Sequence, residues 1–144
     1  MKKNQTLAMK FQIRAIELLE TCINSPKLPL GEETVFQFDI NLEHRIVAEK
    51  GIVIVICSVS VLNEDREQLF GKLKSSCLYD VENLSEFINP DTKSVELPEP
   101  FGVTLNSVSL STTRGLMFSF FRGTFLHNAI MPILDPTTFM MDKK

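Results

Sequence analysis

Alternating apolar and polar residues predict three β-strands in the first half of the chain. Along 35–46, large apolar side chains share one face of the predicted strand, which is typical of a half-buried antiparallel strand. The β-branched run at 52–62 is too densely apolar for an edge strand and predicts a central one, and a further strand is expected at 69–81. Short polar turns separate the three runs, so we expect an antiparallel meander.

The stretch FQIRAIELLETCI at 11–23 is ambiguous. Its alanine, glutamate and leucine residues favour a helix by propensity, whereas Phe11, Ile13 and Ala15 alternate as in a strand. Residues 1–8 are expected to form a flexible lead. Two prolines and a glycine within 25–31 predict a loop after this stretch.

The second half of the chain predicts one long helix. Pro90, Pro98 and Pro100 prevent a long helix before it, so 82–103 is expected to be a crossover loop. The helix is predicted at 104–122, and 123–144 is expected to form an extended tail. Strands first and helix last indicate a single α+β domain over 1–144, with the sheet at 11–81.

The end of the predicted helix is apolar on nearly every side. Five large apolar residues lie between Leu116 and Phe121, so the chain's own core or another subunit must cover them. Small residues recur every four positions, at Ser107, Ser111, Gly115 and Ser119. An ordinary core helix on a sheet and a helix at a subunit interface both fit this pattern. The candidate interface residues are Ser111, Gly115, Leu116, Ser119 and Phe120.

Composition and charge narrow the class of protein. The formal net charge of −3 comes without a basic stripe, which argues against nucleic acid as a partner. The three cysteines Cys22, Cys57 and Cys77 are odd in number and widely spaced, which indicates free thiols in a reducing compartment. We find neither a secretory signal nor an apolar run long enough to span a membrane, and therefore expect a cytoplasmic protein that does not insert into a membrane.

No motif in the sequence calls for an enzyme, a metal or a cofactor. His44 and His127 are far apart, and neither has a cysteine or a second histidine at the spacing of a metal site, so both are expected to be structural or to face solvent. A nucleophile elbow and a phosphate-binding loop are both absent from the sequence.

The segment after the predicted helix resembles that of a known family. Its RGTF at 122–125, followed by Asn128-Ala129 and Pro132, is similar to the end of the long helix in SecB-type export chaperones. The FQI at 11–13, the three strands, the proline-marked crossover and the helix follow in the order of that family. The chain therefore resembles a SecB-like protein over most of its length.

The resemblance implies a fold, an assembly and a function. It implies a four-stranded antiparallel sheet, with its first strand starting at Phe11, and one long helix, in a dimer of dimers whose helices lie between the sheets. Members bind unfolded or pre-secretory polypeptides without ATP in apolar grooves. The candidate groove residues are Leu78, Tyr79, Phe87, Ile88, Phe101, Phe125, Ile130 and Leu134.

Two departures separate this chain from the export members. Those members carry a second helix and a flexible tail after the segment that matches 130–139, whereas this sequence ends at Lys144, so part of the groove or docking surface is expected to be missing. They also offer an acidic sheet face to the motor ATPase SecA, and Lys72 and Lys74 dilute such a face here. A solitary chaperone, including one that protects an antitoxin, is at least as plausible as an export factor.

Two other functions fit the same hydrophobic pattern. One is a domain that binds a small apolar ligand between sheet and helix. The other is a structural subunit that uses the apolar helix only for assembly. All three functions require the same buried phenylalanines, so the pattern alone does not separate them.

Overall fold

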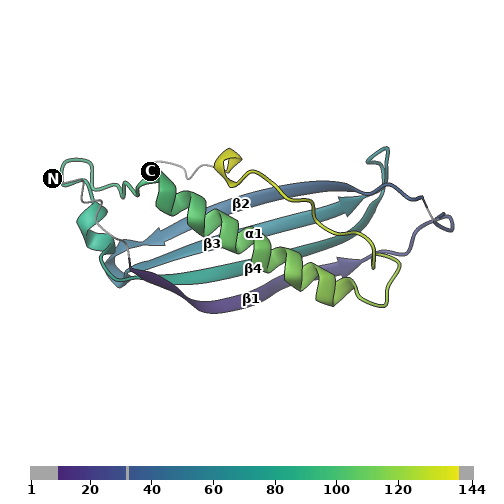
Figure 1. The fold of residues 1–144 in the computed structure, drawn as a ribbon, viewed down its shortest axis with the longest axis horizontal. Coiled ribbons are helices and arrows are strands. Elements are labelled where there is room, and N and C mark those ends of the chain that lie inside the picture. The colour runs from purple at the N-terminus through teal and green to yellow at the C-terminus, as the bar shows by residue number, and fades with distance from the viewer. Residues whose placement is uncertain (1–9, 32, 140–144) are drawn as a thin grey trace.

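The fold is a four-stranded antiparallel sheet with one long helix lying diagonally across one face (Figure 1). The computed structural model describes residues 10–31 and 33–139. The strands are β1 (Phe11–Ile23), β2 (Gln37–Val47), β3 (Ile52–Leu62) and β4 (Leu69–Val81); the helix is α1 (Glu99–Phe121), and short 3-10 turns lie at η1 (Ala48–Lys50), η2 (Leu84–Phe87) and η3 (Pro136–Thr138). This α+β architecture confirms the predicted fold class.

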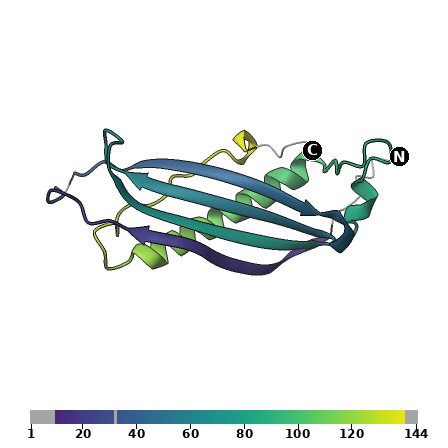
Figure 2. The ribbon, with the colours of Figure 1, turned by 180° about the vertical axis from the view of Figure 1, so that it is seen from behind.

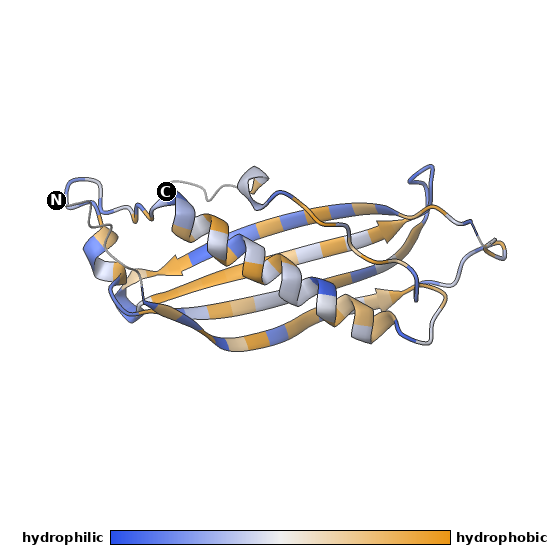
Figure 3. Ribbon diagram, viewed as in Figure 1, coloured by the Kyte–Doolittle hydropathy of each residue, from blue (hydrophilic) through white to orange (hydrophobic). Residues whose placement is uncertain are grey.

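The strand order in the sheet is β1-β4-β3-β2. The strands β2, β3 and β4 pair one after another as the predicted meander. The first strand, β1, pairs with β4 and forms the sheet edge opposite β2. On β2, hydrophobic and hydrophilic residues alternate along the strand (Figure 3), because one face lies on the core and the other faces solvent. The densely apolar β3 is central, as predicted.

The register of β1 explains why its sequence pattern is ambiguous. The pairing with β4 shifts between Ile13 and Ala15 and again between Leu18 and Glu20. Each shift adds one residue to β1 and moves the next side chain to the other face. The residues opposite the helix-facing positions of β4 are therefore Phe11, Ile13, Ile16, Leu18, Thr21 and Ile23. This uneven spacing hides the simple alternation of a strand.

The helix begins earlier than the sequence pattern predicts. It starts at Glu99 instead of 104, so the crossover that was expected over 82–103 ends at Pro98 and contains η2. Pro100 does not prevent this start, because the first turn of a helix needs no amide donors from its own residues. The second strand likewise starts at Gln37 and not at 35.

Two core clusters lie between α1 and the sheet. One contains Leu73, Met117 and Phe121, and the other contains Val55, Tyr79 and Leu105. The helix packs against β3 and β4, whereas the opposite face of the sheet carries no helix (Figure 2). We call these the helix-bearing face and the outer face.

The C-terminal segment (residues 123–139) runs back along the helix over the helix-bearing face (Figure 1). Leu126, Ala129 and Met131 of this segment are buried in the first core cluster. The expected lead at 1–8 and the last residues of the expected tail, 140–144, lie outside the described residues. In the described part of the chain, no helix combines the length and apolar character that crossing a membrane requires.

Candidate functional site

A polar network ties α1 to both β2 and the C-terminal segment. The Oδ1 atom of Asn106 lies 2.6 Å from Nε2 of His44, on β2. The Nδ2 atom of the same amide donates to the carbonyl oxygen of Pro136, at 3.3 Å, and to that of Phe139. Asn106 is only 2% exposed. Buried polar groups need hydrogen-bond partners, and these contacts supply them for both the oxygen and the nitrogen of the amide. His44 is thus part of a hydrogen-bonded link between strand and helix.

Arg114 holds the same segment two turns further along the helix. Its Nε donates to the carbonyl oxygen of Met131 and its Nη2 to that of Pro132, both at 2.9 Å. We call Asn106 and Arg114 the clamp. The sequence pattern predicts neither residue as part of a site, because their partners are backbone carbonyls of a distant segment.

The C-terminal segment divides into two parts that differ in burial. In residues 126–131, the side chains of Leu126, Ala129 and Met131 are at most 3% exposed. In residues 132–139, which we call the strap, no residue is buried, and Ile133 is 92% exposed. Leu134 and Phe139 of the strap pack partly buried against the first core cluster.

Apolar side chains of β1 remain uncovered on the helix-bearing face. Ile13, Ile16 and Leu18 are 39%, 47% and 48% exposed, although they lie opposite buried positions of β4. The reason is geometric, since α1 packs mainly on the central strands β3 and β4 and contacts this edge strand at its start, where Phe101 meets Phe11. β1 therefore offers both an apolar strip and an unpaired strand edge.

The predicted row of small residues lies on the solvent side of α1. Ser107, Ser111, Gly115 and Ser119 are all exposed, and Phe118 beside them is 50% exposed. Leu116 and Phe120 are partly buried and pack against the first core cluster. The helix is thus covered on one side by the sheet and left open along the small-residue row.

The candidate groove residues do not form one surface. Tyr79 is fully buried and Phe101 is 6% exposed, so both belong to the core. Phe101 packs edge-on against Phe11, with ring centroids 4.9 Å apart. Leu78 lies opposite Ile54 on the outer face, because neighbouring residues of a strand point to opposite faces.

The remaining candidates lie at two places. Phe87 and Ile88 are partly buried in the crossover, where Ile88 pairs with Val95. Phe125 packs edge-on against Phe70, with ring centroids 5.5 Å apart. In the C-terminal segment, Ile130 is 55% exposed and Leu134 lies in the strap.

Hydroxyl pairs occupy the core between β4 and α1. The hydroxyl of Tyr79 lies 2.8 Å from that of Ser109, and the hydroxyl of Ser75 lies 2.9 Å from that of Thr113. Burial raises the pKa of the Tyr79 phenol above its ordinary value. Burial likewise raises the pKa of the Cys57 thiol to about 11.

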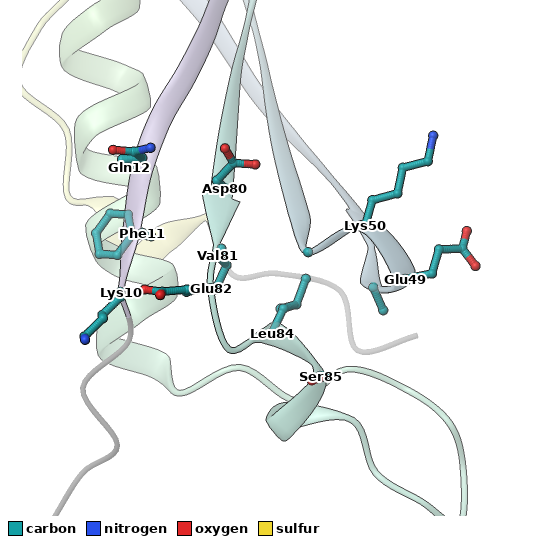
Figure 4. A pocket seen from close by; sticks show the side chains of 12 residues that line it. Lys10, Phe11, Gln12, Glu49, Lys50, Asp80, Val81, Glu82, Leu84 and Ser85 are labelled. Carbon is teal, nitrogen blue, oxygen red and sulfur yellow. The ribbon is translucent and has the colours of Figure 1, made fainter.

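An open pocket of about 750 Å³ lies at one end of the sheet, where β1 begins and the turn between β2 and β3 meets η2 (Figure 4). Apolar Phe11, Val81 and Leu84 share its lining with charged residues, among them Glu49 and Lys50. The side chains of these two residues point away from the others (Figure 4). A small apolar ligand requires mainly apolar walls, so this pocket does not favour that alternative.

Charges on the outer face are largely paired. Ion pairs join Arg14 to Asp80, Arg45 to Glu43, Arg66 to Asp39 and Lys72 to Glu20. Each acidic partner therefore has a basic neighbour, and the face lacks a continuous acidic field. Among the described residues, no group of three or more histidine, cysteine or acidic side chains is arranged to hold a metal ion.

The sheet order and the diagonal helix define the SecB-like fold. The Mycobacterium tuberculosis Rv1957 SecB-like chaperone, solved in complex with a ChAD peptide from the Rv1956 HigA1 antitoxin, matches this structure with a TM-score of 0.64. The match covers 86% of this chain and 89% of that chain at 16% sequence identity. No protein-family model and no curated protein matches the sequence. The resemblance drawn from the motifs is thus confirmed for the fold.

Proposed function

We propose that this chain is a holdase-type chaperone that binds an unfolded polypeptide client without ATP. The observation that carries the proposal is the uncovered apolar surface on the helix-bearing face of a SecB-like fold. Ile16 and Leu18 of β1 and Ile130 after the helix are each about half exposed. An unfolded client gains free energy by burying its own apolar side chains against such a surface, and its aggregation then slows.

Two separate apolar sites are proposed to bind the client, one at Phe87 and Ile88 in the crossover and one at Phe125 and Ile130 after the helix. Phenylalanine and isoleucine side chains bind many partner shapes through contact area and do not require a particular hydrogen-bond pattern. Tyr79 and Phe101 support this surface from the core instead of contacting the client.

A dedicated client fits the surface better than general export does. The fold neighbour was solved with a peptide from an antitoxin, and a peptide of that kind is the client we favour here. Docking to SecA by an acidic sheet face is not favoured, because the acidic groups Asp39, Glu43 and Asp80 on the outer face are paired with arginines. Mutual pairing of this kind weakens long-range attraction to a basic partner.

We further propose that the chain acts as a homo-oligomer. The exposed row at Ser111, Gly115 and Ser119 allows the helix of a second copy to approach closely, and Phe118 supplies apolar area beside it. The unpaired edge of β1 offers a second contact of the same kind. A dimer of dimers uses both surfaces.

The test is whether the purified protein keeps a chemically unfolded polypeptide soluble after dilution, without nucleotide. We expect stoichiometric suppression of light scattering, and we expect the substitution Ile130→Ser to weaken it. Ile133→Ser is the matched control, because Ile133 is an even more exposed isoleucine three positions away. Client aggregation at the rate seen without the protein would refute the holdase role while leaving the fold assignment intact.

A further inference from the structure

The hydrogen bonds that join the strap to the helix are all accepted by its main chain. The clamp residue Arg114 donates to the carbonyl oxygens of Met131, just before the strap, and of Pro132, at its start, and Asn106 donates to those of Pro136 and Phe139, at its end. Every acceptor is a backbone carbonyl, a group that any polypeptide offers at each residue. The clamp therefore holds the start of the strap and the two sides of the turn η3 through groups that do not depend on side-chain identity.

The other hydrogen bonds of the strap are local. The amide of Thr137 donates to the carboxylate of Asp135 at 2.9 Å, and the amide of Phe139 donates to the carbonyl of Pro136 at 3.4 Å. Neither bond crosses to the sheet or the helix. Releasing the strap from the body of the protein thus breaks the clamp contacts and leaves its internal turn intact.

The apolar contacts of the strap are also partial. Leu134 and Phe139 pack against the same core cluster as half-buried side chains of β2 and its preceding residues, namely Phe36, Phe38, Ile40 and Leu42. Residues 126–131, in contrast, are anchored by three buried side chains. We call Phe36, Phe38, Ile40 and Leu42 the apolar bed. Opening at residue 132 therefore frees the clamp and removes two apolar side chains from the cluster that the bed packs against, while the buried side chains of residues 126–131 stay in place.

We propose that the clamp and this apolar bed form a binding site for the main chain of a client segment that ends in a tight turn like η3, and that the strap is the chain's own occupant of that site. The inference rests on the proposed function and adds a residue-level mechanism to it. A client segment with apolar side chains about as far apart as Leu134 and Phe139 replaces the strap, takes over the three carbonyl contacts at Pro132, Pro136 and Phe139, and covers the bed. Strap closure then lowers the apparent affinity for the client by the fraction of molecules that are closed.

Hydrogen exchange of the unmodified protein tests the displacement directly. The probe is reduced and carboxymethylated α-lactalbumin, a permanently unfolded polypeptide, and its binding is measured separately by fluorescence anisotropy. We expect bound client to speed exchange in residues 132–139 and to leave residues 126–131 unchanged. Binding that leaves strap exchange unchanged or slows it overturns the displacement while the holdase function stands. Absence of binding overturns both.

Variants of the strap give a second test, because the proposal predicts a rise in client affinity where a direct contact of the strap with the client predicts a fall. The double substitution Leu134→Ser with Phe139→Ser loosens the strap and leaves the clamp in place, so we expect client affinity to rise, up to about tenfold if closure dominates. Adding Arg114→Ala to this variant is expected to reverse the gain. Ile133→Ser is the control in the same segment, because the fully exposed Ile133 side chain holds nothing closed. A fall in affinity on loosening the strap would show that Leu134 and Phe139 contact the client themselves, which overturns the proposal.

Discussion

His44 and Asn106 join the edge strand β2 to the long helix through a 2.6 Å contact between Nε2 and Oδ1. Because the Asn106 amide group donates to strap carbonyls, its oxygen must accept, and His44 is therefore the donor in this pair. One buried side chain thus fixes the position of the helix on the sheet and of the strap on the helix.

The substitution Asn106→Leu is expected to destabilise the protein by about 1–3 kcal/mol, because it leaves the His44 ring nitrogen and the carbonyl of Pro136 without partners. Urea unfolding measures the loss, and faster hydrogen exchange of the strap should accompany it. Ser107→Ala, on the exposed side of the same turn, is the control and is expected to change stability by less than about 0.5 kcal/mol. Equal stability of both variants would contradict the structural role of Asn106.

Gly71 on β4 has no room for a side chain. A Cβ atom there would lie 2.6 Å from Cδ1 of Leu126 and 3.2 Å from the carbonyl oxygen of Cys22. Leu126 is fully buried and has no space to move into, so Gly71→Ala is expected to cost about 1–3 kcal/mol of unfolding free energy. Gly31→Ala is the control, since nothing lies within 4 Å of its Cβ position. Thermal unfolding of the two variants should differ by several degrees in Tm.

Stability is expected to fall as pH rises above 9. Burial raises the pKa of Cys57 from its ordinary value of 9.0 to about 11, so between these values the folded protein keeps a proton that the unfolded chain releases. Unfolding then releases protons and becomes easier with increasing pH. Since one pKa unit corresponds to about 1.4 kcal/mol, the loss from this thiol is on the order of 2–3 kcal/mol across the window.

The substitution Cys57→Val separates the contribution of Cys57 to this loss of stability from that of other groups that also destabilise the protein at high pH. The buried Tyr79 phenol also has a raised pKa and adds to the loss at high pH. Valine fills a similar volume and does not titrate, so urea unfolding across this window should show a shallower decline than for the unmodified protein. An identical decline would show that Cys57 does not supply the titrating group.

The sequence predicted the sheet better than it predicted the ends of the elements. Strands β3 and β4 begin and end where the hydrophobic pattern places them, because a dense apolar run marks the central strand β3 and a nearly regular alternation marks β4. Residues 11–23 were harder, since two register shifts break the alternation and leave propensity to favour a helix. The family resemblance decided between helix and strand there.

The residues of the candidate surface were harder to predict than the strands, because their exposure depends on which distant element covers them. Tyr79 and Phe101 share their apolar character with true surface residues, and only the helix that covers them decides their burial. Asn106 and Arg114 act on backbone carbonyls of a segment that lies at least 17 residues away, and such partners leave no residue pattern in the sequence. Contacts with main-chain atoms are thus the part of this site that required a structure.

Gly115 distinguishes a helix that is open to solvent from one that a second copy covers. Nothing lies within 4 Å of its Cβ position, and it is exposed in the middle of the small-residue row. In a single chain, Gly115→Ala is therefore expected to raise stability by up to about 1 kcal/mol, because alanine is the better helix former.

Within an assembly built on this row, Gly115→Leu is expected to separate the subunits, because the larger side chain prevents close approach. Light scattering coupled to size exclusion measures the mass, with Gly31→Leu as the control outside the helix. An oligomer that survives Gly115→Leu would place the interface elsewhere and leave α1 as an ordinary core helix.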